Sequence, residues 1–190
     1  MRALASLLLA VCAAGCGVPP GPAGDEYGVY GVVGTLSAHE CGQKAAPIQL
    51  PYARDLELRR AEGGLGYLYG SDGAIMQGTL ASDGRFRFTE QSGVRVIEPD
   101  EVFGVRGCDL MVTTTLEGVA PRAVDEETGE AELAHFEGSL VTRIAPSGGS
   151  DCSELLFGSS SGGNFEALPC AIELELEGEP VAPDEESDAQ

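Results

Sequence analysis

The segment Ile172-Glu173-Leu174-Glu175-Leu176-Glu177 is the clearest evidence for the fold class, because an apolar residue and a carboxylate alternate in it without a break. Successive side chains of a β-strand point to opposite faces of the sheet, so one face of this segment is apolar and the other is charged. The pattern predicts a half-buried antiparallel strand with its glutamates in water. We expect this strand at a sheet edge, where charge discourages pairing with another sheet.

The same period of two recurs upstream, and helical patterns are almost absent. Alternation is clear at residues 56–59, 85–89 and 94–96, and it extends over longer runs at 110–117 and 136–144. Turn signals separate many of these segments at intervals of about ten residues, as in a β-meander. The predicted turns are Gly63-Gly64, Ser71-Asp72-Gly73, Ser82-Asp83-Gly84 and Ser92-Gly93.

Glycine accounts for 27 residues, which is about twice its average share. Some glycines fall at predicted strand positions, such as Gly66, Gly78 and Gly138, where a curved sheet bends. A long meander must bury one face and hide its two edges. The sequence therefore predicts an all-β domain that forms a single up-and-down barrel of about eight to ten strands, with a two-sheet β-sandwich as the alternative.

The N-terminus has the features of a secretory signal. Met1-Arg2 carries one positive charge, and residues 3–14 are apolar except for Ser6 and Cys12, a run too short to span a bilayer as a mature helix. The run ends in Ala13-Ala14-Gly15-Cys16, which resembles the lipobox of bacterial lipoproteins. The resemblance implies cleavage after Gly15, diacylglycerol on the Cys16 sulfur and acylation of the new amino terminus.

Two alternatives to lipidated Cys16 stay open. Cys12 is a rival lipid site, but Val11 before it is β-branched and fits a narrow peptidase groove poorly. An ordinary signal peptide cleaved near Ala14 would leave Cys16 as a free thiol or a disulfide partner.

The segment after Cys16 is rich in proline and glycine and predicts a tether that holds a folded domain away from a membrane. In the sorting known for enteric bacteria, a residue other than Asp after the lipidated cysteine favours the outer membrane, and Gly17 fits that rule. We therefore predict a signal peptide at 1–15, a lipid anchor and tether at 16–27, one β domain at 28–178 and an acidic, disordered tail at 179–190.

The chain is strongly acidic, with 11 Lys and Arg residues against 31 Asp and Glu residues and a formal net charge of −20 at pH 7. Loss of Arg2 with the signal makes the mature chain more acidic still. Such a chain repels nucleic acid and anionic headgroups, so a nucleic-acid partner is disfavoured. We expect this acidity to serve solubility rather than to bind a specific cation, and we expect a monomer.

Four cysteines remain for disulfides once Cys12 is removed and Cys16 is lipidated. They are Cys41, Cys108, Cys152 and Cys170. No Cys-x-x-Cys or His-Cys spacing suits zinc, so we predict disulfides of an oxidising compartment and neither a metal nor a cofactor.

The first choice of pairing joins Cys152 to Cys170 across a Ser/Gly loop, which leaves Cys41 for Cys108. Closing a loop of that length is worth about 3 kcal/mol in the chain-entropy model. If successive strands alternate in direction, Cys108, Cys152 and Cys170 lie at the same rim of the sheet, so a pairing of Cys108 with Cys152 stays open.

The search for catalytic residues finds one nominal match, because Gly158-Ser159-Ser160-Ser161-Gly162 fits the G-x-S-x-G nucleophile elbow. That elbow needs a strand-to-helix turn and a histidine later in the chain, whereas no histidine follows His135. A Ser/Gly loop explains the match better. We expect His39 and His135 to be surface residues rather than general bases.

Clustered carboxylates are the other chemical candidates, because they serve glycoside hydrolysis and bind Ca²⁺. Asp125, Glu126, Glu127 and Glu130 surround Thr128-Gly129, a predicted hairpin tip, and lack the ligand spacing of an EF-hand. We expect a solvated loop here.

The aromatic residues are expected to be mainly core. A wide barrel would let some of them line a cavity, as in proteins similar to lipocalins, but the Gly-x-Trp signature of that family is absent, since the chain has no Trp.

Three hypotheses follow. The leading one is a lipid-anchored, non-enzymatic envelope protein, in the outer membrane, whose β domain binds a protein or a surface polysaccharide or has a structural role. The second is a lipocalin-like carrier of a small apolar ligand. The third is a hydrolase whose activity would fall on replacement of Glu126 or Glu127 by Gln.

The anchor is testable by the substitution Cys16→Ser, which removes the sulfur that receives the lipid. We expect the variant to take up no labelled palmitate and to be soluble or unprocessed, whereas Cys12→Ser should be labelled like the wild type. Unchanged labelling of Cys16→Ser would refute the assignment.

Overall fold

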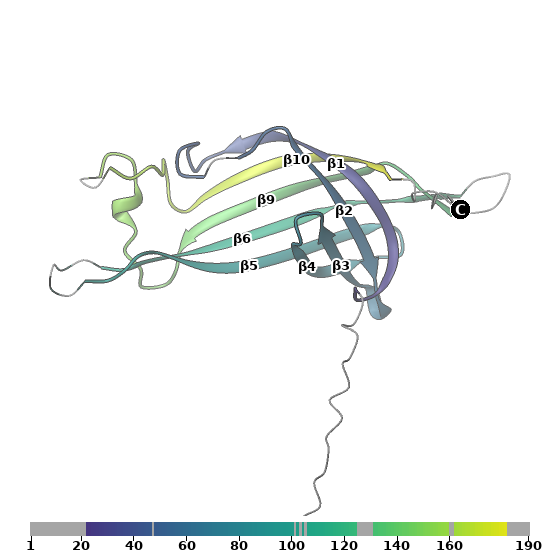
Figure 1. Cartoon of the computed structure of the whole chain (residues 1–190), viewed down its shortest axis with the longest axis horizontal. Coiled ribbons are helices and arrows are strands. Elements are labelled where there is room, and N and C mark those ends of the chain that lie inside the picture. Colours follow the sequence, from purple (N-terminus) through teal and green to yellow (C-terminus); the bar gives the residue numbers. More distant parts are fainter. Residues whose placement is uncertain are drawn as a thin grey trace, which may run out of the picture.

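The computed structural model describes residues 22–46, 48–100, 102, 104, 106–124, 131–159 and 162–181. Several predictions lie outside these residues: the signal peptide, the lipid site at Cys16, the start of the tether, the acidic loop at 125–130 and most of the tail. Within the described residues the fold is all-β, as predicted (Figure 1).

Ten strands are described, and two short 3₁₀ turns accompany them. The strands are β1 (Asp25–His39), β2 (Tyr52–Arg60), β3 (Leu65–Gly70), β4 (Ile75–Leu80), β5 (Arg85–Ile97), β6 (Cys108–Val119), β7 (Arg122–Val124), β8 (Ala131–Leu133), β9 (Phe136–Pro146) and β10 (Cys170–Pro180).

Eight of these strands form a closed antiparallel barrel in the order β1-β10-β9-β6-β5-β4-β3-β2. Each strand lies beside its neighbour in the chain, except that β7 and β8 form a separate hairpin between β6 and β9, around the predicted hairpin tip. Pairing of β1 with β10 closes the ring. The predicted up-and-down barrel is confirmed, and the two-sheet sandwich is not formed.

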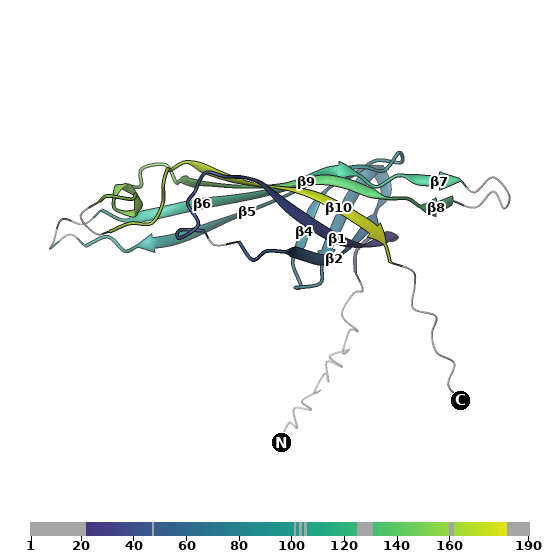
Figure 2. The same cartoon turned by 90° about the horizontal axis from the view of Figure 1, so that it is seen from above.

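The strands of the ring differ greatly in length. β3 and β4 have six residues each and β2 has nine, whereas β1 has 15, β5 has 13, β6 has 12, and β9 and β10 have 11 each. The ring is therefore complete only over the length of β3 and β4. Beyond them the long strands continue as a curved open sheet (Figures 1 and 2).

The closed part of the barrel is filled by side chains. Phe86 stacks on Phe136 with ring centroids 5.3 Å apart and on Phe88 at 5.6 Å, and Tyr30 meets Phe136 at 5.6 Å. Buried leucines from neighbouring strands complete this core: Leu58, Leu80, Leu116 and Leu176. Rings of this size fit in the interior because glycines of the neighbouring strands stand opposite them: Gly118 opposite Phe86, Gly78 opposite Phe88 and Gly178 opposite Phe136.

Two glycines show why this position excludes a side chain. A Cβ on Gly78 would lie 2.0 Å from the Arg87 carbonyl oxygen, and one on Gly118 would lie 2.2 Å from the Glu137 carbonyl oxygen and 2.9 Å from the Phe86 ring. The predicted strand glycines thus mark places where strands bend closely against their neighbours.

Three sequence predictions about strands are wrong. β1 begins at Asp25, inside the predicted tether, because Asp25 and Glu26 pair with Arg60 and Arg59 across the strands. β10 is not an edge strand, since it lies between β1 and β9. The segment Ser92-Gly93 is not a turn but continues β5, where it pairs with residues 111–112 of β6.

The preferred disulfide pairing is also wrong. The structure joins Cys41 to Cys170 and Cys108 to Cys152, which was the open alternative for Cys108. The chain after β9 turns back along the start of β6, where Asp151 donates its backbone N–H to Gly107, and this places Cys152 beside Cys108.

The Cys41–Cys170 disulfide depends on closure of the ring. The Glu40 backbone N–H donates to the Ala171 carbonyl oxygen at 2.9 Å, which holds the end of β1 beside the start of β10. The Cys41–Cys170 disulfide therefore links the segment after β1 to the start of β10, and the Cys108–Cys152 disulfide links the start of β6 to the segment after β9. The long strands β5, β6, β9 and β10 extend away from the β7–β8 hairpin (Figure 2).

Two tyrosines of β1 give a matched test of the core. The Tyr30 side chain is fully buried, and its hydroxyl has no hydrogen-bond partner among the described residues, whereas the Tyr27 hydroxyl donates to the Ala120 carbonyl oxygen at 2.8 Å. We expect Tyr30→Phe to raise the free energy of unfolding by about 1 kcal/mol and Tyr27→Phe to lower it by about 1 kcal/mol, measured by urea denaturation at pH 7.

The pH dependence of the free energy of unfolding gives a further test of the buried Tyr30 hydroxyl. Burial raises the pKa of Tyr30 to about 12, so the stability contributed by its neutral form is complete below pH 10 and is lost as the pH rises through 12. The advantage of Tyr30→Phe should therefore grow between pH 9 and pH 11. An advantage that stays constant over this range would contradict the assignment.

Candidate functional site

The shortness of β3 and β4 leaves one side of the barrel open. β2 pairs with β3 only over Leu56–Arg60, so residues 52–55 have a strand neighbour on one side only. β5 pairs with β4 only over residues 86–89, and residues 90–97 pair with β6 alone. We call the gap between these two edges, beyond the β3–β4 hairpin, the open side.

Two adjoining hollows, of about 290 and 190 Å³, lie at the open side and share Tyr52, Arg54 and Leu140. We refer to them together as the groove. The groove is lined from β2, β3, β4, β5, β6, β9 and β10 and from the segment before β2, by residues that include Ile48, Leu68, Met76, Glu90, Thr114, Leu116, Thr142, Ile144, Ile172 and Leu174.

The floor of the groove is apolar and continuous with the core. Leu116, Leu174 and Met76 are buried beneath it, whereas Leu140 and Thr142 are only half-buried and face the opening. The groove thus offers apolar surface that the barrel itself does not cover. The Thr114 and Thr142 hydroxyl groups, 3.4 Å apart, are polar groups of this floor.

A polar rim borders this floor. Arg54 forms an ion pair with Asp72 of the β3–β4 turn, and its guanidinium carbon lies 5.4 Å from the centre of the Tyr52 ring. Burial raises the pKa of Tyr52 above its ordinary value.

Glu90 supplies the remaining charge of the groove. This carboxylate is exposed, and within the described part of the chain it forms no ion pair. The groove therefore combines an apolar floor, a neutralised Arg54–Asp72 pair and one uncompensated negative charge.

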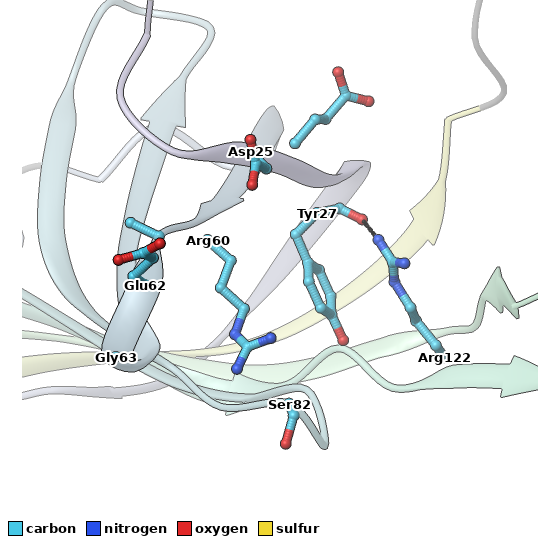
Figure 3. Close-up of a pocket in the computed structure, with 9 residues that line it drawn as sticks. Asp25, Tyr27, Arg60, Glu62, Gly63, Ser82 and Arg122 are labelled. Atoms are coloured by element: carbon cyan, nitrogen blue, oxygen red, sulfur yellow. Dashed lines mark hydrogen bonds between the residues drawn. The ribbon is translucent and has the colours of Figure 1, made fainter.

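A second hollow, of about 420 Å³, lies at the other end of the barrel (Figure 3). The guanidinium groups of Arg60 and Arg122 flank the Tyr27 ring there, and Arg122 lies 4.5 Å from its centre. Arg122 donates to the Tyr27 carbonyl oxygen at 2.5 Å, and Arg60 donates to that of Leu80 at 3.1 Å.

These arginines hold backbone segments together through hydrogen bonds to carbonyl oxygens, and they do not form a purely cationic binding site. Arg59 beside them donates to the Gly24 carbonyl oxygen at 2.9 and 2.7 Å, so the start of β1 is held over the closed end of the barrel. Asp25, Glu26 and Glu62 line the same hollow and offset the guanidinium charges.

The residues considered for catalysis are not brought together. His39 Nε2 lies 2.9 Å from the Ala46 carbonyl oxygen, and His135 pairs with Glu179 at 3.0 Å. The Ser159 hydroxyl donates to the Glu154 carbonyl oxygen, while Ser160 and Ser161 lie outside the described residues. Among the residues described, neither imidazole is hydrogen-bonded to a serine or cysteine side chain.

The described residues also contain no group of three or more His, Cys, Asp or Glu side chains placed to hold a metal ion. No helix among them is long and apolar enough to cross a membrane. The cluster Asp125, Glu126, Glu127 and Glu130 falls outside the part of the chain that the structure describes.

Comparison with protein-family models, curated proteins and solved structures gives no match for this chain.

Sequence reasoning missed the groove, because the residues that line it are ordinary inward positions of separate strands. One signal was present: the turns at residues 71–73 and 82–84 lie close together, so the strands between the first turns must be short. Taking Ser92-Gly93 as a further turn hid the contrast with the long β5.

Proposed function

We propose that this chain is a lipid-anchored, non-enzymatic protein of a bacterial envelope that binds another envelope protein through the open side of its barrel. The observation that carries the proposal is the apolar groove, which opens to the surface beside two incompletely paired strand edges. The lipobox-like Ala13-Ala14-Gly15-Cys16 supports the anchored state.

A protein partner suits this surface better than the other classes considered. The net charge of −20 opposes binding of nucleic acid or anionic polymers. Protein interfaces typically have an apolar centre with a polar rim, and the groove has an apolar floor that includes Leu140 and Leu174, with Arg54, Asp72 and Glu90 among its charged lining residues.

A carrier of a small apolar ligand is the second candidate, and the larger hollow favours it. Its volume of about 290 Å³ is close to the lower bound of ligand pockets, about 300 Å³. The packed rings of Phe86, Phe88 and Phe136 oppose it, because they occupy the part of the barrel where an enclosed ligand would lie.

The substitution Thr142→Arg tests the proposal, because it places a long charged side chain in the groove. Ser139→Arg is the matched control: it lies on the same strand, on the opposite face, between Glu117 and Glu175. Chemical cross-linking of the full-length chain in intact cells should give a defined complex in the wild type and in Ser139→Arg. We expect at least about a tenfold loss of that complex in Thr142→Arg.

Thermal unfolding must show that both variants are folded. Equal cross-linking of all three chains would contradict binding through the groove. Native mass spectrometry that finds a bound lipid in the wild type and not in Thr142→Arg, without a protein complex, would instead establish the carrier.

A further inference from the structure

We infer that the partner supplies an extended segment, which adds as a strand to the edge of β5 beside the groove and places a Lys or Arg side chain against Glu90. The inference rests on the proposed function and names the kind of partner that the open side takes. The occupant is a basic, extended peptide segment of another protein.

The edge of β5 is long and uncovered. Its residues 90–97 pair with β6 on one side, and no strand of the described structure pairs with them on the other. A Cβ placed on Gly93 would meet no atom within 4 Å, and the Val94 side chain is 49% exposed. An uncovered edge of this length is a template for another strand.

The hydrogen bonds that β5 forms with β4 and β6 show in which direction the backbone groups of residues 90–95 point. The Arg85 carbonyl oxygen accepts from the Ala81 N–H, so the backbone groups of Arg85 face β4. In an antiparallel ladder this direction alternates along the strand, and odd-numbered residues of β5 up to the bulge after Arg95 therefore face away from β6.

The end of the β5–β6 pairing near Arg95 shows the same alternation. Asp109, which stands opposite Arg95, turns its N–H to Ser150 and its carbonyl oxygen to Ser147, on the β9 side. The pair Arg95–Asp109 is therefore not hydrogen-bonded through the backbone. It follows that Gln91, Gly93 and Arg95 present free N–H and C=O groups at the edge.

An added strand would extend the wall of the barrel over the groove. Glu90, Ser92 and Val94 share the inner face of β5 with Phe86 and Phe88, so alternate side chains of the added strand would point into the groove. Backbone hydrogen bonds would then provide affinity, and the apolar floor with Glu90 would provide specificity.

The charges at the edge select a basic segment. Arg95 is already paired with Asp109 at 2.7 Å and with Glu98 at 3.6 Å, and Arg54 is paired with Asp72. Glu90 is left as the uncompensated charge of the groove. A second copy of this chain would bring a further net charge of −20 and a second Glu90, so it is a poor occupant.

Two substitutions at Gly93 provide the test. Gly93→Pro removes the outward N–H without touching the bonds to β6, and proline is tolerated where a strand N–H faces solvent. Gly93→Ala keeps the N–H and adds a methyl group in open space. The probe is the peptide (Lys-Val)₄-amide with fluorescein on its amino terminus, compared with (Glu-Val)₄ and (Lys-Pro)₄ labelled in the same way. Binding to the full-length chain in detergent is measured by fluorescence anisotropy.

We expect (Lys-Val)₄ to bind the wild type and Gly93→Ala within about twofold of each other, and Gly93→Pro at least about tenfold more weakly. (Lys-Pro)₄ should bind at least about tenfold more weakly than (Lys-Val)₄, because every second residue lacks a backbone N–H and the proline rings fix φ away from the value of a β-strand. Glu90→Gln should reduce the preference for (Lys-Val)₄ over (Glu-Val)₄.

Equal binding by Gly93→Pro and the wild type, or no binding of (Lys-Val)₄ at all, would overturn strand addition. A dimer in sedimentation that Gly93→Pro dissociates would overturn the choice of a foreign peptide. If Gly93→Pro leaves the cross-linked complex intact while Thr142→Arg abolishes it, strand addition fails but binding through the groove stands.

Discussion

Two of the eight strands in the ring, β3 and β4, are only six residues long, and they lie between the longer strands β2 and β5. A barrel is closed only where every strand is present, since each strand must hydrogen-bond to two neighbours. The length of this one hairpin therefore determines where the aromatic core ends and where the groove begins. It also determines which backbone groups of β5 are left without a strand partner.

Closure of the ring itself depends on β1 and β10, the first and last strands. Their pairing extends from Tyr30 opposite Pro180 to His39 opposite Ile172, and the Cys41–Cys170 disulfide fixes the end of that seam. A covalent link between residues so distant in the chain restricts the unfolded state strongly. The groove opens where the two short strands β3 and β4 leave β2 and β5 partly unpaired.

The alternation at Ile172–Glu177 correctly predicted strand type, buried face and fold class, because side-chain parity is a local property. Ring neighbours are not local, so the edge position expected for this strand and the preferred Cys152–Cys170 pairing were wrong. Ser92-Gly93 has turn composition but lies within a strand, because pairing with β6 overrides local preference. The groove residues Tyr52, Leu140 and Glu90 come from three strands and share no sequence motif.

Amide hydrogen exchange along β5 in the free protein tests the open edge most directly. We expect rapid exchange at Gln91, Gly93 and Arg95, whose N–H groups face outward, and slow exchange at Glu90, Ser92 and Val94, which bond to β6. Alternating protection of this kind would support an edge without a strand partner. Uniform protection of all six amides would contradict it, because the edge of β5 would then be paired already.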